Sequence, residues 1–92
     1  MRVTVHYLAQ LKQAAGRGSE ETTALPGAAL GDFLRALGER RPGAFRAMLL
    51  DETGQPRSTL VYFVGEEHAP LTHPLQDGDS VTILAPMSGG ET

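Results

Sequence analysis

One strongly amphipathic segment limits the folds open to this chain. Apolar side chains recur in it at helical spacing: Leu30, Phe33, Leu34 and Leu37. That spacing predicts a helix with one buried face. Pro26-Gly27 before it and Pro42-Gly43 after it are expected to end regular structure. Since a single helix cannot bury its apolar face alone, other elements must cover it.

Strand-like segments can supply that cover. Apolar and polar residues alternate over Arg2–Leu8 and over Ser80–Ala85, which is typical of strands with one buried face. Glu20–Leu25 predicts a more polar strand antiparallel to the first, and Leu60–Val64 predicts an apolar one. We expect a short edge strand within His68–Leu71. The order predicts an α+β fold, in which one main helix lies on one face of a mixed four- to five-stranded sheet.

Two short helical turns are expected besides the main helix. The first covers Ala9–Ala15 and ends at Gly16. We expect it to place Leu8 and Leu11 beneath the sheet. The second is indicated by a later apolar cluster: Phe45, Met48 and Leu49.

Charge and cysteine content exclude several classes of function. The net charge is -3, whereas nucleic-acid-binding domains usually carry a basic patch. We interpret the basic pair Arg40-Arg41 as complementing the dipole of the main helix. The absence of cysteine excludes disulfides and thiol catalysis, and it is consistent with a cytoplasmic location. No apolar run approaches the ~20 residues of a membrane span, so no membrane partner is expected.

Few side chains are arranged for catalysis or metal binding. The three histidines, His6, His68 and His73, are scattered over a strand and two loops, so we expect no metal site. Glu66-Glu67 and the pair Asp77 and Asp79 are interpreted as solvated turn residues, with an acidic rim for a basic partner as the alternative. A chain of 92 residues builds one small core. We therefore expect no enclosed cleft, no bound cofactor and no enzymatic activity of its own.

The C-terminal segment is the most informative part of the sequence: Pro86, Met87, Ser88, Gly89, Gly90, Glu91 and Thr92. Glycine lacks a Cβ, so a Gly-Gly pair can pass a narrow channel and leaves its carbonyl open to attack. Residues 86–90 could extend about 17 Å at ~3.4 Å per residue. We predict a domain over residues 1–86 and a flexible tail over residues 87–92, and a merely frayed terminus is the alternative.

Three segments in order carry a family pattern: YLAQLKQAAG (Tyr7–Gly16), LGDFLRAL (Leu30–Leu37) and HPLQDGDSVTILAPMSGG (His73–Gly90). Through them the whole chain resembles the MoaD/ThiS family of ubiquitin-like sulfur carriers, including its CysO-type members. The resemblance implies a β-grasp, ubiquitin-like fold.

The resemblance also implies a chemistry. An E1-like enzyme would use ATP to adenylate the Gly90 carboxylate, which would become a thiocarboxylate and donate its sulfur to an acceptor synthase. The residues that thread the tail into these partners would be Gly89, Ser88, Met87 and Pro86. The chain would be a co-substrate, at most the small subunit of a molybdopterin synthase. Molybdopterin, cysteine or homocysteine, thiamine and tRNA thiolation all stay open as pathways.

Glu91-Thr92 departs from the family pattern, because the free carboxylate belongs to Thr92 rather than to Gly90. We favour removal of both residues by a JAMM-type peptidase. A cloning artefact and a paralogue without carrier function are the alternatives.

Two other functions are compatible with the same residues. A ubiquitin-like modifier would form isopeptide bonds after the same activation, and its only lysine acceptor for self-linkage would be Lys12. A β-grasp interaction module would use its outer sheet face. In Leu60–Val64 either Val61 and Phe63 or the alternate residues face away from the helix. The candidate docking residues are Leu60, Tyr62, Val64 and Leu84.

Overall fold

The computed structural model describes residues 1–41 and 43–85. The predicted tail, residues 87–92, lies outside them, and so does Pro86, the last residue of the predicted domain, so the boundary between domain and tail stays a prediction. Within these described residues, eight elements follow one another: β1 Arg2–Tyr7, α1 Ala9–Ala15, β2 Ser19–Thr23, α2 Leu30–Glu39, α3 Ala44–Leu49, β3 Val61–Val64, β4 Glu67–His68 and β5 Ser80–Leu84.

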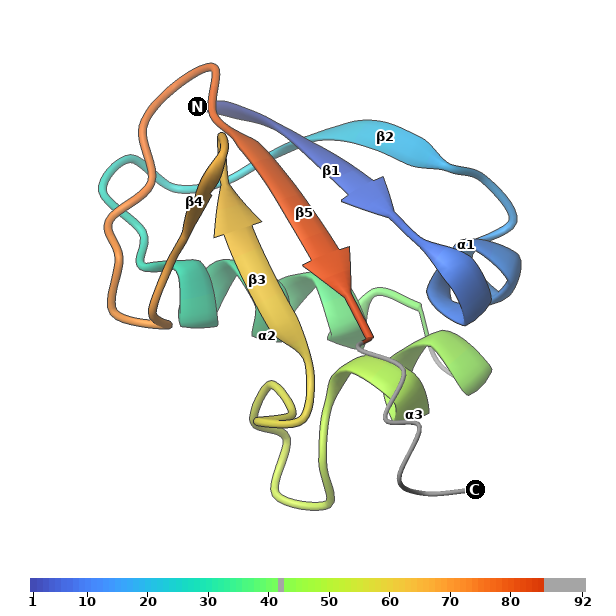
Figure 1. Cartoon of the computed structure of the whole chain (residues 1–92). Coiled ribbons are helices and arrows are strands. Elements are labelled where there is room, and N and C mark those ends of the chain that lie inside the picture. Colours follow the sequence, from blue (N-terminus) through green and yellow to red (C-terminus); the bar gives the residue numbers. More distant parts are fainter. Residues whose placement is uncertain (42, 86–92) are drawn as a thin grey trace.

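The strands form one mixed sheet in the order β2-β1-β5-β3-β4. β1 pairs with β2 in antiparallel and with β5 in parallel orientation, whereas β3 is antiparallel to both β5 and β4. α2 crosses one face of the sheet, and α1 and α3 lie near the end of the sheet at which β1 and β5 finish (Figure 1). The predicted α+β arrangement is therefore confirmed, with five strands.

The core lies between the sheet and α2. Alternation along β1 points Val3, Val5 and Tyr7 toward the helix, as a period of two requires. Val81 and Ile83 of β5 lie beside Val5 and Tyr7. The buried face of α2 is the predicted one, with Gly38 added: Leu30, Phe33, Leu34, Leu37 and Gly38. None of the buried residues in the described part of the chain is polar or charged.

The short helix α1 spans the predicted residues and ends at Gly16, whose φ of 79° is left-handed. Leu11 is buried as expected, but the prediction for Leu8 was wrong, because its side chain is 40% exposed. Leu8 still has extended backbone angles, so the alternation of β1 continues through it. Tyr7 points inward, and Leu8 therefore points to the outer face.

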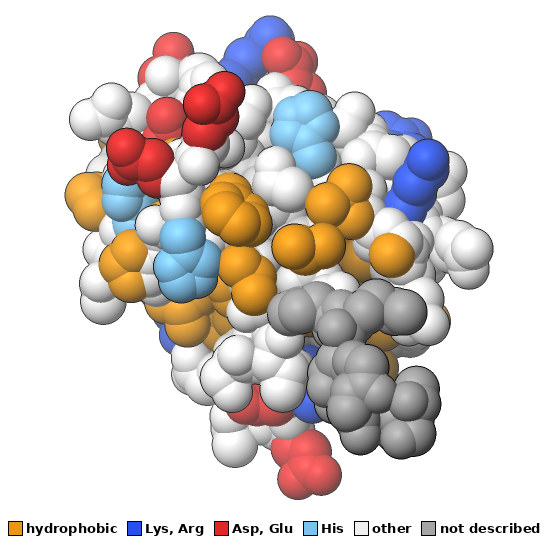
Figure 2. Space-filling model, in the orientation of Figure 1, with side chains coloured by type: hydrophobic (Ala, Val, Ile, Leu, Met, Phe, Trp, Pro, Cys, Tyr) orange, Lys and Arg blue, Asp and Glu red, His pale blue; other side chains and the backbone are white. Residues whose placement is uncertain are grey.

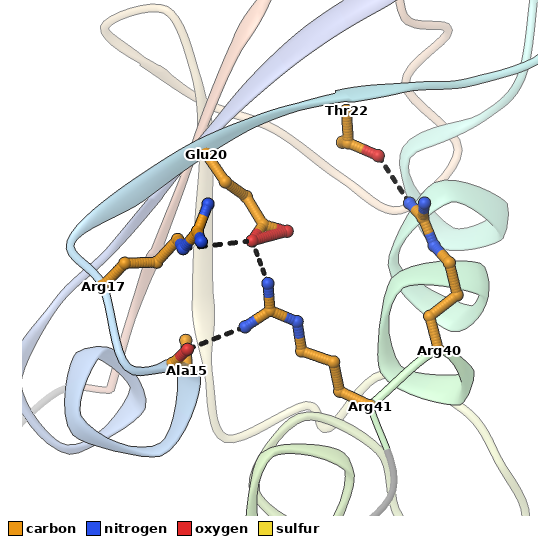
Figure 3. Close-up of polar contacts among 6 residues, drawn as sticks. All are labelled: Ala15, Arg17, Glu20, Thr22, Arg40 and Arg41. Atoms are coloured by element: carbon orange, nitrogen blue, oxygen red, sulfur yellow. Dashed lines mark hydrogen bonds and ion pairs between the residues drawn. The ribbon is translucent and has the colours of Figure 1, made fainter.

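Arg40 and Arg41 reach β2, which the dipole interpretation did not foresee (Figure 3). Arg41 donates to the carboxylate of Glu20 and, over 2.8 Å, to the backbone oxygen of Ala15. Its guanidinium also lies 5.4 Å from the centre of the Phe45 ring. The Glu20 side chain is only 10% exposed, so its charge needs a partner. Arg41 thereby joins the end of α2 to β2 and α1.

Replacing Arg41 with methionine should lower the free energy of unfolding by roughly 1.5–3 kcal/mol, the range for hydrogen bonds to charged groups. The aliphatic stem stays, while Glu20 loses its closest cation. Urea denaturation measures the change. Arg46→Met on the exposed side of α3 is the matched control and should change stability by less than ~0.5 kcal/mol. Equal losses in the two variants would contradict a specific role for Arg41.

Candidate functional site

The chain leaves the sheet from its central strand. β5 ends at Leu84, and Ala85 is the last described residue before the segment predicted to be functional. β1 finishes at the same end, because Tyr7 pairs with Ile83. The residue predicted to react is Gly90, and the residues predicted to thread the tail are Gly89, Ser88, Met87 and Pro86; all five lie outside the described residues. Of the predicted site, the structure therefore describes the surface around Ala85.

Apolar side chains cover the outer face beside this point. Val61 is the register partner of Leu84, and Phe63 is the partner of Thr82. All four point away from α2, since Tyr62, Val81 and Ile83 are the buried residues of these strands. Figure 2 shows hydrophobic side chains gathered at the centre of this face, with histidines beside them. We call Leu8, Val61, Phe63 and Leu84 the outer apolar patch.

The structure corrects the predicted docking set. Tyr62 is 5% exposed, and its hydroxyl donates to the backbone oxygen of Arg57 over 2.9 Å. Leu60 and Val64 lie two positions before and after Tyr62, so their side chains point to the same side of the sheet, and both pack against the core. Leu84 alone of the set lies on the outer face, where Val61 and Phe63 take the places assigned to the other residues. Docking itself stays a prediction.

Leu8 belongs to the patch, although sequence reasoning placed it in the core. It directly follows Tyr7, the partner of Ile83, so it lies beside the end of β5. At the other side of the patch, the Phe63 ring meets the His68 ring edge-on at 5.9 Å. The patch therefore crosses the sheet from the end of β1 to β3, where His68 of β4 borders it, and its Leu8 and Leu84 lie next to Ala85.

The acidic turn residues lie at the opposite end of β5. Asp77 accepts a hydrogen bond from the backbone N–H of Arg2 over 2.7 Å, and Asp79 accepts one from Gln76 over 2.8 Å. These contacts support the turn interpretation. Acidic side chains gather toward the upper edge of the face in Figure 2, away from the centre of the apolar patch. Within residues 1–41 and 43–85, no group of His, Asp and Glu side chains could hold a metal ion.

Shifted pKa values mark the core and one loop. Burial, reinforced by the nearby charge of Glu20, raises the pKa of Tyr7, whose hydroxyl lacks a hydrogen-bond partner within the described residues. Burial also raises the pKa of Tyr62 from 10.0 to about 12. A hydrogen bond from the Thr53 hydroxyl, 2.6 Å long, is the main cause that lowers the pKa of Asp51. None of these side chains belongs to the outer apolar patch.

The raised pKa of Tyr62 predicts a loss of stability in alkali. The folded protein holds the proton more tightly than the unfolded chain, so the stabilisation is complete below pH 10 and disappears as the pH rises to about 12. A shift of this size corresponds to roughly 2–3 kcal/mol. Urea denaturation at a series of pH values measures it. Tyr62→Phe should flatten the part of the profile due to this residue, and an unchanged profile would contradict the assignment.

A known protein-family pattern matches most of this chain. The pattern of the ThiS family matches residues 5–90. Curated protein sequences contain no significant match. Among the residues that the structure describes, no helix has the length and apolarity needed to cross a membrane.

Several solved structures have the same fold. SAMP1 of Haloferax volcanii is 24% identical over 98% of this chain and 100% of its own, with a TM-score of 0.87. A putative molybdopterin converting factor subunit 1 from Pyrococcus furiosus is 25% identical over 95% of this chain and 99% of its own, with a TM-score of 0.77. A chain of the BexX/CysO complex of Amycolatopsis orientalis is 25% identical over 96% and 99%, with a TM-score of 0.66.

Proposed function

Since the chain belongs to the ThiS family, we propose that it is a sulfur carrier whose reacting group is the carboxylate of Gly90. The observation that carries the proposal is the extent of the family match. It runs through Gly89 and Gly90 and stops before Glu91 and Thr92. The family pattern therefore ends where the tail chemistry requires a free carboxylate.

The proposed reaction begins with release of that carboxylate. A peptidase of the JAMM type hydrolyses the bond between Gly90 and Glu91. A carboxylate oxygen of Gly90 then attacks the α-phosphorus of ATP on an E1-like enzyme, and pyrophosphate leaves. A hydrosulfide equivalent attacks the acyl carbon, AMP leaves, and a thiocarboxylate remains. The chain lacks cysteine, so this main-chain group is its route to carrying sulfur.

The outer apolar patch gives such partners a place to dock. An enzyme that takes up the tail beginning after Ala85 comes close to Leu84 and its neighbour Val61. Exposed apolar side chains beside a functional segment are typical of protein-binding surfaces. The BexX/CysO neighbour is itself a complex with a second protein. We propose a sulfur-accepting synthase as the second partner, in a molybdopterin or an amino-acid-type pathway.

Two exposed leucines allow a matched test of docking. Leu8 is 40% exposed in the outer apolar patch, and Leu25 is 79% exposed after β2. Burial of part of a leucine side chain contributes about 1 kcal/mol. Leu8→Ser should therefore raise the KM for the carrier about fivefold in an ATP–pyrophosphate exchange assay with a ThiS-type activating enzyme. Leu25→Ser should leave it unchanged, and the reverse ranking would contradict the docking surface.

The function itself is tested by comparing residues 1–90 with residues 1–92 in the same assay. The shorter chain should support pyrophosphate exchange, and the longer one should not until a peptidase has acted. Equal exchange by both chains, or exchange by neither, would contradict Gly90 as the reacting residue.

A further inference from the structure

A groove lies between α2 and the segment that follows β2. Its volume is about 110 Å³, several times the ≈ 30 Å³ that one water occupies in the liquid. Apolar side chains form most of its lining: Ala24, Leu25, Ala28, Phe33 and Ala36. Such a groove can accept one aliphatic side chain from outside.

The same region borders an open sheet edge. β2 is an edge strand, and its pairing with β1 shows which backbone groups are free. Met1 and Ala24 exchange two hydrogen bonds, of 2.8 and 2.9 Å, and Tyr7 donates to Gly18 over 2.8 Å. Bonded pairs alternate in an antiparallel ladder. The residues between the bonded pairs therefore direct their N–H and C=O groups away from β1: Ser19, Glu21 and Thr23.

The fold leaves an apolar side chain uncovered at this place. Leu25 is 79% exposed. Two large hydrophobic residues within 1–41 and 43–85 are exposed, and Leu25 is the more exposed of them. It lines the groove together with Phe33, a core residue of α2. An added side chain in the groove would cover Leu25 and touch the edge of the core.

The charge around the groove selects the kind of occupant. Asp32 lines it, but Arg35 neutralises that carboxylate. Arg40 also lines the groove and donates to the Thr22 hydroxyl over 2.5 Å (Figure 3). No carboxylate of the described residues forms an ion pair with Arg40. The groove therefore offers one cation that a carboxylate from outside could engage.

We propose that the β2 edge and this groove bind an extended segment of a partner protein as an added strand. The segment pairs with the free backbone groups of Glu21 and Thr23, places one aliphatic side chain against Leu25 and Phe33, and sets an acidic residue against Arg40. Main-chain pairing supplies affinity and the pocket supplies specificity, as in other cases of strand addition.

The binding edge is remote from the proposed sulfur chemistry. Thr23 lies beside Arg2 at the start of β1, whereas the tail begins next to Tyr7 at its end. The five steps along β1 from Arg2 to Tyr7 separate the two places by about 17 Å at ~3.3 Å per residue. One protein can therefore hold the β2 edge while another takes up the tail. The inference does not depend on the proposed function.

The test uses the full chain and a synthetic peptide, Val-Thr-Val-Thr-Val-Asp-Asp-Asp, as the probe. Amide hydrogen exchange should slow on binding at Glu21 and Thr23. Glu20 and Thr22, already paired with β1, should show little change. A peptide with lysines in place of its aspartates should bind at least about tenfold more weakly. Absence of protection at millimolar peptide would overturn the proposal.

Paired variants separate this edge from the outer apolar patch. Leu25→Ser and Arg40→Gln should each weaken peptide binding at least about fivefold, whereas Leu8→Ser and Arg46→Gln should not. The opposite ranking would place the peptide on the outer face and overturn the proposal. Sedimentation at several protein concentrations tests whether a second copy of this chain occupies the groove instead. Self-association abolished by Arg40→Gln would show that the occupant is a second copy, which also contradicts the proposal.

Discussion

Replacing Gly90 with valine is expected to reduce kcat/KM for adenylate formation by at least about a thousandfold, or ~4 kcal/mol of transition-state stabilisation. A β-branched side chain would stand next to the carboxylate that must attack ATP. It would also remove the backbone freedom that glycine gives a segment threaded through a narrow channel. The effect should appear with residues 1–90 as the substrate, so that processing does not limit the rate.

Thr92→Val in the full chain is the matched control for Gly90→Val. Under the proposed processing, Thr92 is removed before activation, so its replacement should leave the rate after cleavage unchanged. If Gly90→Val reacted as fast as the parent chain, the carboxylate of Gly90 would not be the group that is activated.

Replacing Gly38 with valine is expected to lower the free energy of unfolding by about 3 kcal/mol or more, the upper end of the cost of overpacking a core. Gly38 lies in α2 and packs against Leu49, the last residue of α3, and against Leu50, which follows it. A Cβ at this position would lie 2.7 Å from Cδ1 and 2.8 Å from Cγ of Leu50. Helix propensity alone predicts the opposite sign for Gly38→Ala, a gain of about 1 kcal/mol. Urea denaturation of both variants decides between the two expectations.

A double-mutant cycle shows whether Leu50 causes the loss. Leu50 is 2% exposed, so Leu50→Ala alone should cost about 2–5 kcal/mol. Gly38→Ala combined with Leu50→Ala should cost at least ~1 kcal/mol less than the sum of the single changes, because the new methyl group enters the space that leucine leaves. Additive losses would contradict the close contact.

Periodicity predicted the elements whose two sides differ in polarity. β1, α2 and β5 were predicted close to their observed bounds, because each has a clear apolar face. The run Leu60–Val64 is apolar throughout, so its alternation could not reveal which residues face the helix. Pairing of Tyr62 with Ile83 decides the phase in the structure. That information comes from register between strands distant in sequence.

The contacts that sequence reasoning missed are also long-range. Arg41 and Glu20 are 21 positions apart, and local rules at a helix C-terminus say nothing of a partner on another strand. The groove behind Leu25 likewise forms only when α2 packs beside the end of β2. The tail that is predicted to react is the reverse case. Its assignment rests on glycine chemistry and on the family pattern, which are local and readable from sequence.

The mass of the intact protein after reaction tests the central claim most directly. The chain is incubated with a JAMM-type peptidase, a ThiS-type activating enzyme, ATP and a sulfide source. We expect loss of the residues Glu91 and Thr92, followed by a gain equal to the difference between one sulfur and one oxygen atom, located by fragmentation at Gly90. A chain that keeps its original mass, or that gains sulfur at any other residue, would contradict the account.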